Sequence, residues 1–177
     1  TAQRVASLDM EHHSMNVHFS SKKQDWATPW LLFQEWAASH GPFELDVCAT
    51  VKNAKCKCFF SPADDGLIQE WRGICWMNPP YGRDLPHWIS KAVAEVRAGR
   101  ASRVVCLIPA RTDTAWWHDF VLPYGAVHYL RGRVRFEGAA SSAPFPSAVV
   151  IFEKRSYSTE ALFGCWTKPY RILDGDS

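Results

Sequence analysis

The sequence predicts an α/β fold: a mostly parallel, twisted sheet with helices on both faces and an antiparallel hairpin at its C-terminal end. Apolar runs that suit buried strands alternate with segments of helical periodicity through most of the 177 residues. The clearest strand spans residues 103–109, whose near-continuous apolar run is typical of a strand covered on both faces. After residue 125 the strand candidates are short and have no helix between them, which predicts the hairpin.

The first half of the chain is expected to supply one helix and three strands. The helix begins at Thr28-Pro29, where Thr suits the N-cap and Pro the first helical position, and it ends at Gly41-Pro42. Its apolar face consists of Leu31, Leu32, Phe33 and Trp36. The three strands span residues 43–49, 56–60 and 74–77.

The second half is expected to alternate helix and strand before it reaches the hairpin. A helix over residues 85–98 ends at Gly99, and a second helix over residues 113–121 follows the strand at 103–109. Three short strands come last, over residues 126–130, 134–136 and 148–152. Ligands in such sheets bind beyond the carboxyl ends of the strands, so we expect the site at residues 46–50, 78–81 and 109–112.

The length favours one domain, residues 25–177, preceded by a flexible arm over residues 1–24. A separate target-recognition domain does not fit. The formal net charge of +2 does not decide whether nucleic acid is a partner, so a DNA-binding surface must come from local Lys and Arg clusters. No apolar run could span a bilayer and no targeting segment is evident, so we expect a cytoplasmic protein without a membrane partner.

Tryptophan and cysteine stand out in the composition. The nine Trp residues predict either a Trp-rich core or a pocket whose rings receive flat heterocycles. The six Cys residues lie mostly in apolar runs, where a free thiol behaves as a small apolar group. Cys56 and Cys58 have no second Cys or His pair at a zinc spacing, so no metal site is expected.

The motif Asn78-Pro79-Pro80-Tyr81 directly follows an apolar strand and is the most specific signal in the chain. Two consecutive prolines force an extended backbone and remove two N–H donors, which leaves their carbonyls without competing donors. Asn78 adds a side-chain carbonyl and Tyr81 adds a flat ring. The motif therefore suits an aromatic amine, with two acceptors for its hydrogens and one face for stacking. The structural alternative is a Pro-Pro turn with a packed Tyr.

This tetrapeptide matches the [D/N/S]-P-P-[Y/F/W] signature of amino-methyltransferases, and over about residues 20–153 the chain resembles the phage-type Dam family of DNA N6-adenine methyltransferases. The matching stretches are residues 25–29, 43–50, 64–67, 76–83, 107–114, 132–136 and 144–147. The resemblance implies a Rossmann-like methyltransferase fold, S-adenosylmethionine as the cofactor and, for a phage-encoded enzyme, the cytoplasm of the bacterial host.

The resemblance also implies a set of cofactor-binding residues. They are Trp26, Thr28, Pro29, Asp46, Cys48, Ala49, Asp64, Asp65 and Asn78. Thr28-Pro29 would lie near the methionine end, Asp46 would hold the amino group, and either Asp64 or Asp65 would bond the adenosine moiety. Either aspartate could instead cap the turn at Gly66. The chain departs from many methyltransferases because the loop after its first core strand contains no glycine.

The implied reaction transfers a methyl group to the exocyclic N6 amine of adenine in duplex DNA, with the target base flipped out. The implied catalytic residues are Asn78, Pro79, Pro80 and Tyr81. Acceptors at the Asn78 side chain and the Pro79 carbonyl would draw the amine toward a tetrahedral geometry, so its lone pair faces the methyl carbon. Positioning would supply most of the catalysis, and Tyr81 would stack on the flipped base.

Five arginines are candidate DNA contacts. Arg131, Arg133 and Arg135 alternate, so in a strand all three would project from one face, as a phosphate-binding strip or as a solvated hairpin face. Arg83 and Arg111 follow site motifs and could contact phosphates or bases.

Three other functions fit parts of the pattern. RNA adenine methylation is compatible with the tetrapeptide, because the motif does not read the sugar. Methylation of a protein glutamine poses the same chemical problem, but such enzymes carry a Gly-rich first loop and an N-terminal substrate domain that this chain lacks. A non-catalytic nucleic-acid-binding module on a methyltransferase fold is the third alternative, and the intact tetrapeptide and Asp46 argue against it.

Overall fold

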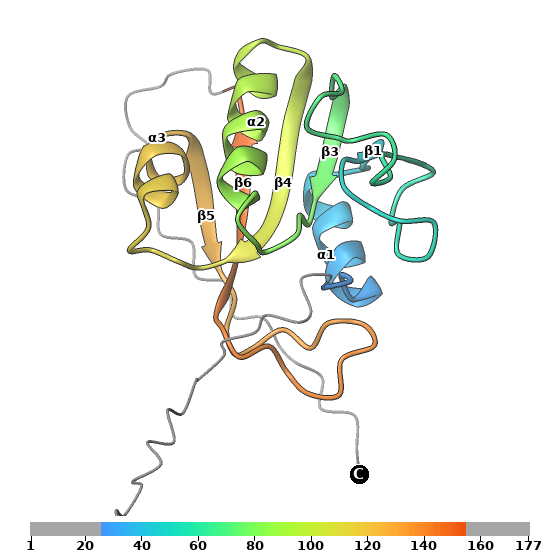
Figure 1. The fold of residues 1–177 in the computed structure, drawn as a ribbon, viewed down its shortest axis with the longest axis vertical. Helices are drawn as coiled ribbons and strands as arrows, with labels where there is room; N and C mark the ends of the chain where they lie inside the picture. Colours follow the sequence, from blue (N-terminus) through green and yellow to red (C-terminus); the bar gives the residue numbers. More distant parts are fainter. Residues whose placement is uncertain (1–25, 155–177) are drawn as a thin grey trace, which may run out of the picture.

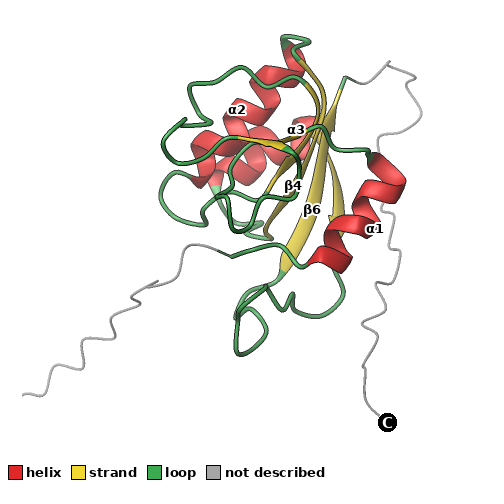
Figure 2. Ribbon diagram, turned by 90° about the vertical axis from the view of Figure 1, so that its right-hand side faces the viewer, coloured by secondary structure: helices red, strands yellow, loops and turns green. Residues whose placement is uncertain are grey.

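A computed structural model describes residues 26–154, which form a six-stranded sheet with helices on both faces (Figure 1). The expected arm, residues 1–24, lies outside the described residues. The strands are β1 (Leu45–Asp46), β2 (Cys58–Phe59), β3 (Gly73–Met77), β4 (Ala101–Pro109), β5 (Gly125–Tyr129) and β6 (Ser147–Glu153). The helices are α1 (Trp30–His40), α2 (Leu85–Arg97), the π-helical η1 (Trp117–Val121) and α3 (Leu122–Tyr124). Figure 2 shows α1 on one face of the sheet and α2 and α3 on the other.

The strand order β2-β1-β3-β4-β6-β5 confirms the expected fold class. The pairs β1–β2, β1–β3 and β3–β4 are parallel, whereas β6 is antiparallel to both β4 and β5. This is the Rossmann-like sheet that the resemblance implies. The chain leaves β1 on one side to form β2 and returns on its other side to form β3, so the strand order reverses there. Such a switch point opens a crevice at the carboxyl ends of the strands.

The hairpin differs from the expected one. Residues 134–136 do not form a strand; β5 pairs with β6, and the 130–146 segment joins them beyond the carboxyl ends of β3 and β4 (orange in Figure 1). Gly132 has a φ of +80°, which interrupts an extended run. The Val134 carbonyl accepts from Ala143, and Glu137 pairs with Ala27, so these backbone groups bond outside a ladder with β6.

Several other boundaries shift for identifiable reasons. The expected strand 43–49 shortens to β1 because the chain turns after Asp46, although the Val47 N–H still bonds to the Trp76 carbonyl of β3. The expected N-cap Thr28 does not cap α1. Pro29 occupies that position, and the carboxylate of the distant Glu137 accepts a hydrogen bond from the Trp30 N–H. The expected helix 113–121 becomes η1 followed by the single turn α3.

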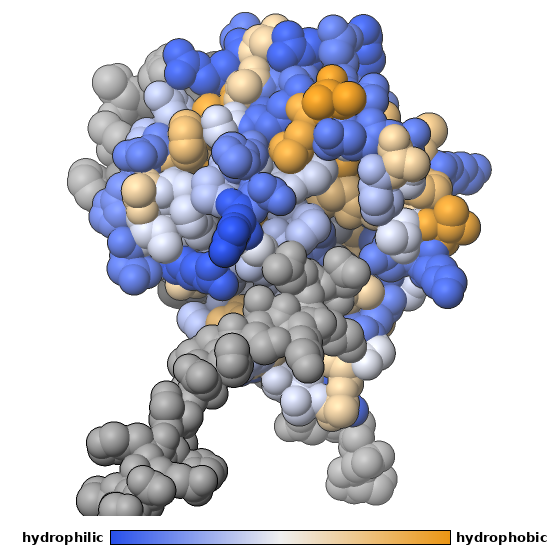
Figure 3. Space-filling view, viewed as in Figure 1, coloured by the Kyte–Doolittle hydropathy of each residue, from blue (hydrophilic) through white to orange (hydrophobic). Residues whose placement is uncertain are grey.

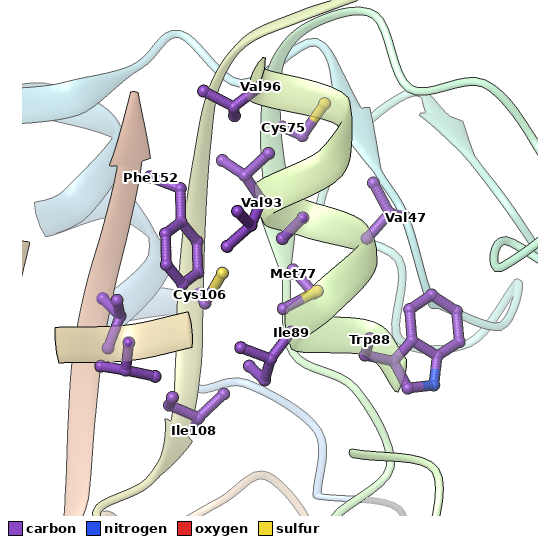
Figure 4. Packing of buried hydrophobic residues seen from close by; sticks show 14 of the residues in the cluster. Val47, Cys75, Met77, Trp88, Ile89, Val93, Val96, Cys106, Ile108 and Phe152 are labelled. Carbon is purple, nitrogen blue, oxygen red and sulfur yellow. The ribbon is translucent and has the colours of Figure 1, made fainter. Parts of the chain in front are cut away.

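The core consists of two apolar layers, one on each face of the sheet. On the α2 face, Ile89 and Val93 point toward Cys106 and Phe152 of the sheet, as Figure 4 shows. Trp71, Trp76 and Trp117 are fully buried, so much of the tryptophan content serves the core. The five cysteines among residues 26–154 are free thiols, and no cluster of metal-ligating side chains occurs in that range.

One face of the molecule gives little indication of an apolar docking site. On the face drawn in Figure 3, hydrophilic residues cover most of the surface, and hydrophobic residues form small separate patches. Within the part of the chain that the structure describes, no helix has the length and apolar character needed to cross a membrane.

Glu95 is a buried charge that the sequence does not single out. Its side chain is only 1% exposed, and its carboxylate accepts hydrogen bonds from the Arg100 guanidinium and the Trp71 N–H and lies 2.6 Å from Lys91 Nζ. Burial alone would raise the pKa of Glu95, but these hydrogen bonds outweigh it and lower the pKa to about 2. Glu95 therefore stabilises the fold as a carboxylate.

We expect Glu95→Gln to lower the free energy of unfolding at neutral pH by about 2–3 kcal/mol, because two cations lose their buried partner. The Glu95 contribution is fully present above the unfolded pKa near 4.5 and is lost as the pH falls toward about 2. Denaturant titration measures the loss. Glu70→Gln is the matched control, because its pair with Arg72 is exposed and such pairs contribute about 1 kcal/mol or less. Equal effects of the two changes would contradict the prediction.

Candidate active site

A cavity opens at the carboxyl ends of β1 and β3, where the strand order reverses. It encloses about 790 Å³ of empty space, including its open mouth. Its lining residues are Trp26, Ala27, Thr28, Asp46, Cys48, Ala49, Thr50, Asn53, Phe60, Ser61, Pro62, Asp65, Gly66, Asn78, Pro79, Pro80 and Trp88. Pro29 and Asp64 are the expected cofactor residues that are outside this set. The motif after β3 and the loop after β1 thus meet at one site.

Asp46 ends β1 and places a buried carboxylate in the cavity wall, with only 3% of the residue exposed. Burial raises the pKa of Asp46 from its usual 3.8 to about 6, although backbone N–H groups of Lys55 and Cys48 bond to the carboxylate and the Lys55 charge lies nearby. Lys55 Nζ itself is paired with Glu137. A buried carboxylate that is costly to ionise suits a cationic ligand.

The loop after β1 reaches its shape without a glycine of its own. The Ala49 N–H bonds to the Phe60 carbonyl, and the Phe60 N–H bonds to the Asp46 carbonyl, so the loop is held by the end of β2. A glycine later in the chain, Gly66, packs against this loop instead. A Cβ on Gly66 would lie 2.2 Å from the Val47 carbonyl oxygen, so only glycine permits this close approach.

Asn78 follows β3 and is held by hydrogen bonds at both ends of its amide. Its Nδ2 donates to the Trp26 carbonyl and to Thr28 Oγ1, the latter at 2.9 Å. A backbone carbonyl can only accept, so this contact fixes which end of the amide is the nitrogen. Oδ1 therefore faces the other way and accepts from the Tyr81 hydroxyl at 2.8 Å.

Tyr81 is not where a stacking residue is expected. The residue is 6% exposed and is not among the residues that line the cavity. Its ring makes edge contacts with Phe136 and Phe145 of the 130–146 segment, at centroid distances of 6.1 and 5.6 Å. The ring is therefore packed against Phe136 and Phe145, as in the structural alternative of a Pro-Pro turn with a packed Tyr.

The structure separates the two candidate aspartates of the next segment. The Asp64 carboxylate accepts from the backbone N–H and hydroxyl of Ser61, which holds a local turn, and these bonds lower the pKa of Asp64. Asp65 lines the cavity, as do Phe60 and Trp88, and adopts a left-handed backbone, with φ +52°. Asp64 therefore holds the turn that begins at Ser61, whereas Asp65 lines the cavity and its Oδ1 also accepts from the Leu67 N–H across Gly66.

Lys55 and Glu137 are site-supporting residues that the sequence analysis missed. Lys55 Nζ lies 3.0 Å from Glu137 Oε2 and 4.2 Å from the centroid of the Trp30 ring, and the Lys55 side chain is 2% exposed. Glu137 also bonds to the Trp30 N–H. These contacts hold the 130–146 segment against α1 and against Lys55, whose backbone N–H bonds to the Asp46 carboxylate. Neither residue belongs to a motif or a periodic run, so only the tertiary structure identifies them.

The candidate DNA-contact arginines are all exposed, and none is among the cavity-lining residues that the structure describes. Arg131, Arg133 and Arg135 lie on the 130–146 segment, which forms no strand at these residues, so the strand from which they were expected to project is absent. They precede Phe136 and Glu137, which contact the Asn78 side of the site through Trp26 and Ala27. The arginines therefore remain on the same edge of the sheet as the cavity.

A family model described as DNA N-6-adenine-methyltransferase (Dam) matches residues 16–172. The chain belongs to the Dam family. It is 36% identical over 154 residues to a DNA N-6-adenine-methyltransferase of Haemophilus phage HP1 (strain HP1c1), a match covering 80% of this chain and 87% of the phage protein. It is 33% identical over 63 residues to the putative methyltransferase YfdM of Escherichia coli (strain K12), covering 32% of this chain and 69% of that protein.

Membership of the Dam family confirms the resemblance inferred from the ordered motifs, and the family match includes every residue that lines the cavity. The chain is thus a methyltransferase of the class that modifies the N6 amine of adenine in DNA. The match favours DNA adenine over the RNA and glutamine alternatives.

Proposed function

We propose that this Dam-family chain transfers a methyl group from S-adenosylmethionine to N6 of an adenine flipped out of duplex DNA. The observation that carries the proposal is the shared cavity of Asp46 and Asn78, one a buried anion and the other an oriented amide acceptor. The anion would bind the cationic methyl donor, and the amide would bind the amine that receives the methyl group, so one cavity would serve both substrates.

The cavity residues fit the chemistry of S-adenosylmethionine, which supplies a methyl group activated by a sulfonium centre when bound. Asp46 suits its ammonium group, because a buried carboxylate gains most from a cationic partner. Cys48 is neutral beside it, since burial raises the pKa of this thiol well above 9. Asp65, Phe60 and Trp88 also line the cavity, where hydroxyls and a flat ring would find an acceptor and apolar walls. Pro29 is outside the lining, so its part in cofactor binding would be to fix the backbone next to Thr28.

Asn78 and Pro79 would act on the target amine. Asn78 and Pro79 line the cavity, so Asn78 Oδ1 and the Pro79 carbonyl would serve as the acceptors, and Pro80 supplies no N–H that could compete for them. Two acceptors that bind both amine hydrogens draw the nitrogen toward a tetrahedral geometry and expose its lone pair. Asn78 cannot accept a proton at neutral pH, so the proton lost from the amine leaves to solvent. Catalysis then rests on positioning.

Access of the base to this acceptor pair requires a rearrangement of aromatic side chains. An adenine inside a duplex is unreachable and must be flipped out at a cost of a few kcal/mol. Stacking on Tyr81 would return about 1–3 kcal/mol, but Phe136 and Phe145 lie against that ring. Stacking therefore requires the 130–146 segment to shift when DNA binds.

The direct test is methyl transfer from labelled S-adenosylmethionine to unmethylated genomic DNA, followed by nucleoside analysis. The expected product is N6-methyladenine, with duplex DNA preferred over RNA of the same sequence. A label in methylcytosine, in RNA alone or in protein would contradict the proposal. Modification-aware sequencing of the same DNA then gives the target site and its stringency.

The arginines of the 130–146 segment are expected to contact phosphates. Replacing Arg131, Arg133 and Arg135 by Gln should weaken DNA binding and flatten its dependence on salt, by about 0.9 in the log–log slope for each lost phosphate contact. Binding isotherms at several salt concentrations measure this slope. Arg72→Gln is the control, because Arg72 is exposed but paired with Glu70. An unchanged slope would mean that the three arginines are only solvated.

A further inference from the structure

We propose that Thr28 and Tyr81 are positioning residues that hold the Asn78 amide in its catalytic orientation from opposite sides. The inference rests on the proposed function, in which Asn78 Oδ1 accepts a hydrogen bond from the target amine. It assigns to the Tyr81 hydroxyl, and not only to the Tyr81 ring, a part in the reaction.

The nitrogen side of the amide is anchored to the segment before α1. Thr28 is 3% exposed, and its Oγ1 and the Trp26 carbonyl both accept from Asn78 Nδ2, so both amide hydrogens have partners. An amide bound through both hydrogens cannot rotate about its last side-chain bond without breaking two partly buried hydrogen bonds. This anchoring explains why Thr28 does not cap α1 and why Glu137 takes that role instead.

The oxygen side is held by Tyr81, whose hydroxyl has one hydrogen and two acceptors within reach. Asn78 Oδ1 lies 2.8 Å away and the Leu107 carbonyl of β4 lies 3.1 Å away. The hydroxyl can donate to Asn78 before DNA binds and to Leu107 when the target amine donates to Oδ1. This exchange needs only a rotation of the O–H bond, so the ring and the amide both keep their places.

Burial of the ring supports a hydroxyl role. A buried tyrosine hydroxyl normally finds a partner, and the Leu107 carbonyl alone would satisfy it. The second, shorter contact to a residue at the cavity is therefore the informative one. Because Tyr81 and Thr28 would act through Asn78, their effects should disappear when the Asn78 side chain no longer carries an amide.

The experiment compares Tyr81→Phe and Thr28→Val in two backgrounds, native Asn78 and Asn78→Ser. Both changes keep the size of the side chain and remove one hydrogen-bonding group. Each should lower the single-turnover rate at saturating DNA and cofactor by about 10- to 100-fold in the native background, the range expected for a misplaced reacting group. For Tyr81→Phe, whose side chain is outside the cavity lining, cofactor and DNA affinities should stay parental. In the Asn78→Ser background, which keeps a residue allowed by the [D/N/S]-P-P-[Y/F/W] signature, neither change should lower the rate further.

Tyr129→Phe is the matched control, because Tyr129 is 47% exposed on β5 and the change removes the same group. A parental rate for Tyr81→Phe would overturn the proposal while leaving the methyltransferase activity of the native protein in place. Equal losses in both backgrounds would also overturn it, since they would show that Tyr81 and Thr28 act independently of Asn78. Failure of the native protein to methylate adenine would instead contradict the proposed function.

Discussion

Asn78→Ala should lower the single-turnover rate of methyl transfer by about 10²–10³-fold, the loss typical of one preorganised hydrogen-bonding group at a reacting centre. The change removes the acceptor that matters most as the amine changes geometry, whereas the cofactor would keep Asp46 and Asp65. The variant should also lose some stability. Ala leaves the Tyr81 hydroxyl with one acceptor and deprives the Trp26 carbonyl of its donor.

The measurement is single-turnover transfer at saturating DNA and cofactor, with cofactor affinity determined separately by calorimetry. Asn53→Ala is the matched control, because Asn53 lines the same cavity but bonds only to the neighbouring Thr50 among the contacts the structure describes. It should retain most of the parental rate. Parental transfer by a folded Asn78→Ala variant would contradict the proposed chemistry.

The parts of the fold that could be predicted from sequence are those with dense local signals. The strands β3 and β4 follow from continuous apolar runs, and α2 follows from its periodicity and the glycine after it. The approach of Asp46 to Asn78 was also predictable, because both follow strands of a parallel sheet and such ends share one edge.

The rest depends on contacts between residues far apart in the chain. Glu137 replaces Thr28 at the start of α1 because a carboxylate more than a hundred positions away reaches the Trp30 N–H. The alternation of Arg131, Arg133 and Arg135 suggests a strand, but Gly132 and the pairing of Glu137 with Ala27 direct this segment across the site. Tyr81 carries a motif signal for stacking, and only packing against the 130–146 segment shows that its ring is covered.

Asp46→Asn should weaken S-adenosylmethionine binding by about 10- to 150-fold, since a hydrogen bond to a charged group is worth about 1.5–3 kcal/mol. The substitution keeps the side-chain volume and removes the charge that the cofactor's ammonium would meet. Calorimetric titration measures the loss. Asp64→Asn is the matched control, because Asp64 bonds to Ser61 and is not among the cavity-lining residues. An unchanged affinity of folded Asp46→Asn would remove Asp46 from the cofactor site.

The pH dependence of cofactor binding gives an independent test of Asp46. Burial raises the pKa of Asp46 to about 6 in the free protein, and a bound ammonium would lower it because a cation favours the carboxylate. Binding should therefore be at full strength above about pH 6 and weaken as the pH falls below that value, by up to about tenfold per pH unit.

The stability of the free protein should depend on pH in the opposite sense. Its Asp46 contribution to stability is present below the unfolded pKa near 3.8 and is lost as the pH rises through about 6. Asp46→Asn should abolish both dependences, and a cofactor affinity of the native protein that is constant from pH 7 down to the onset of unfolding would contradict the assignment.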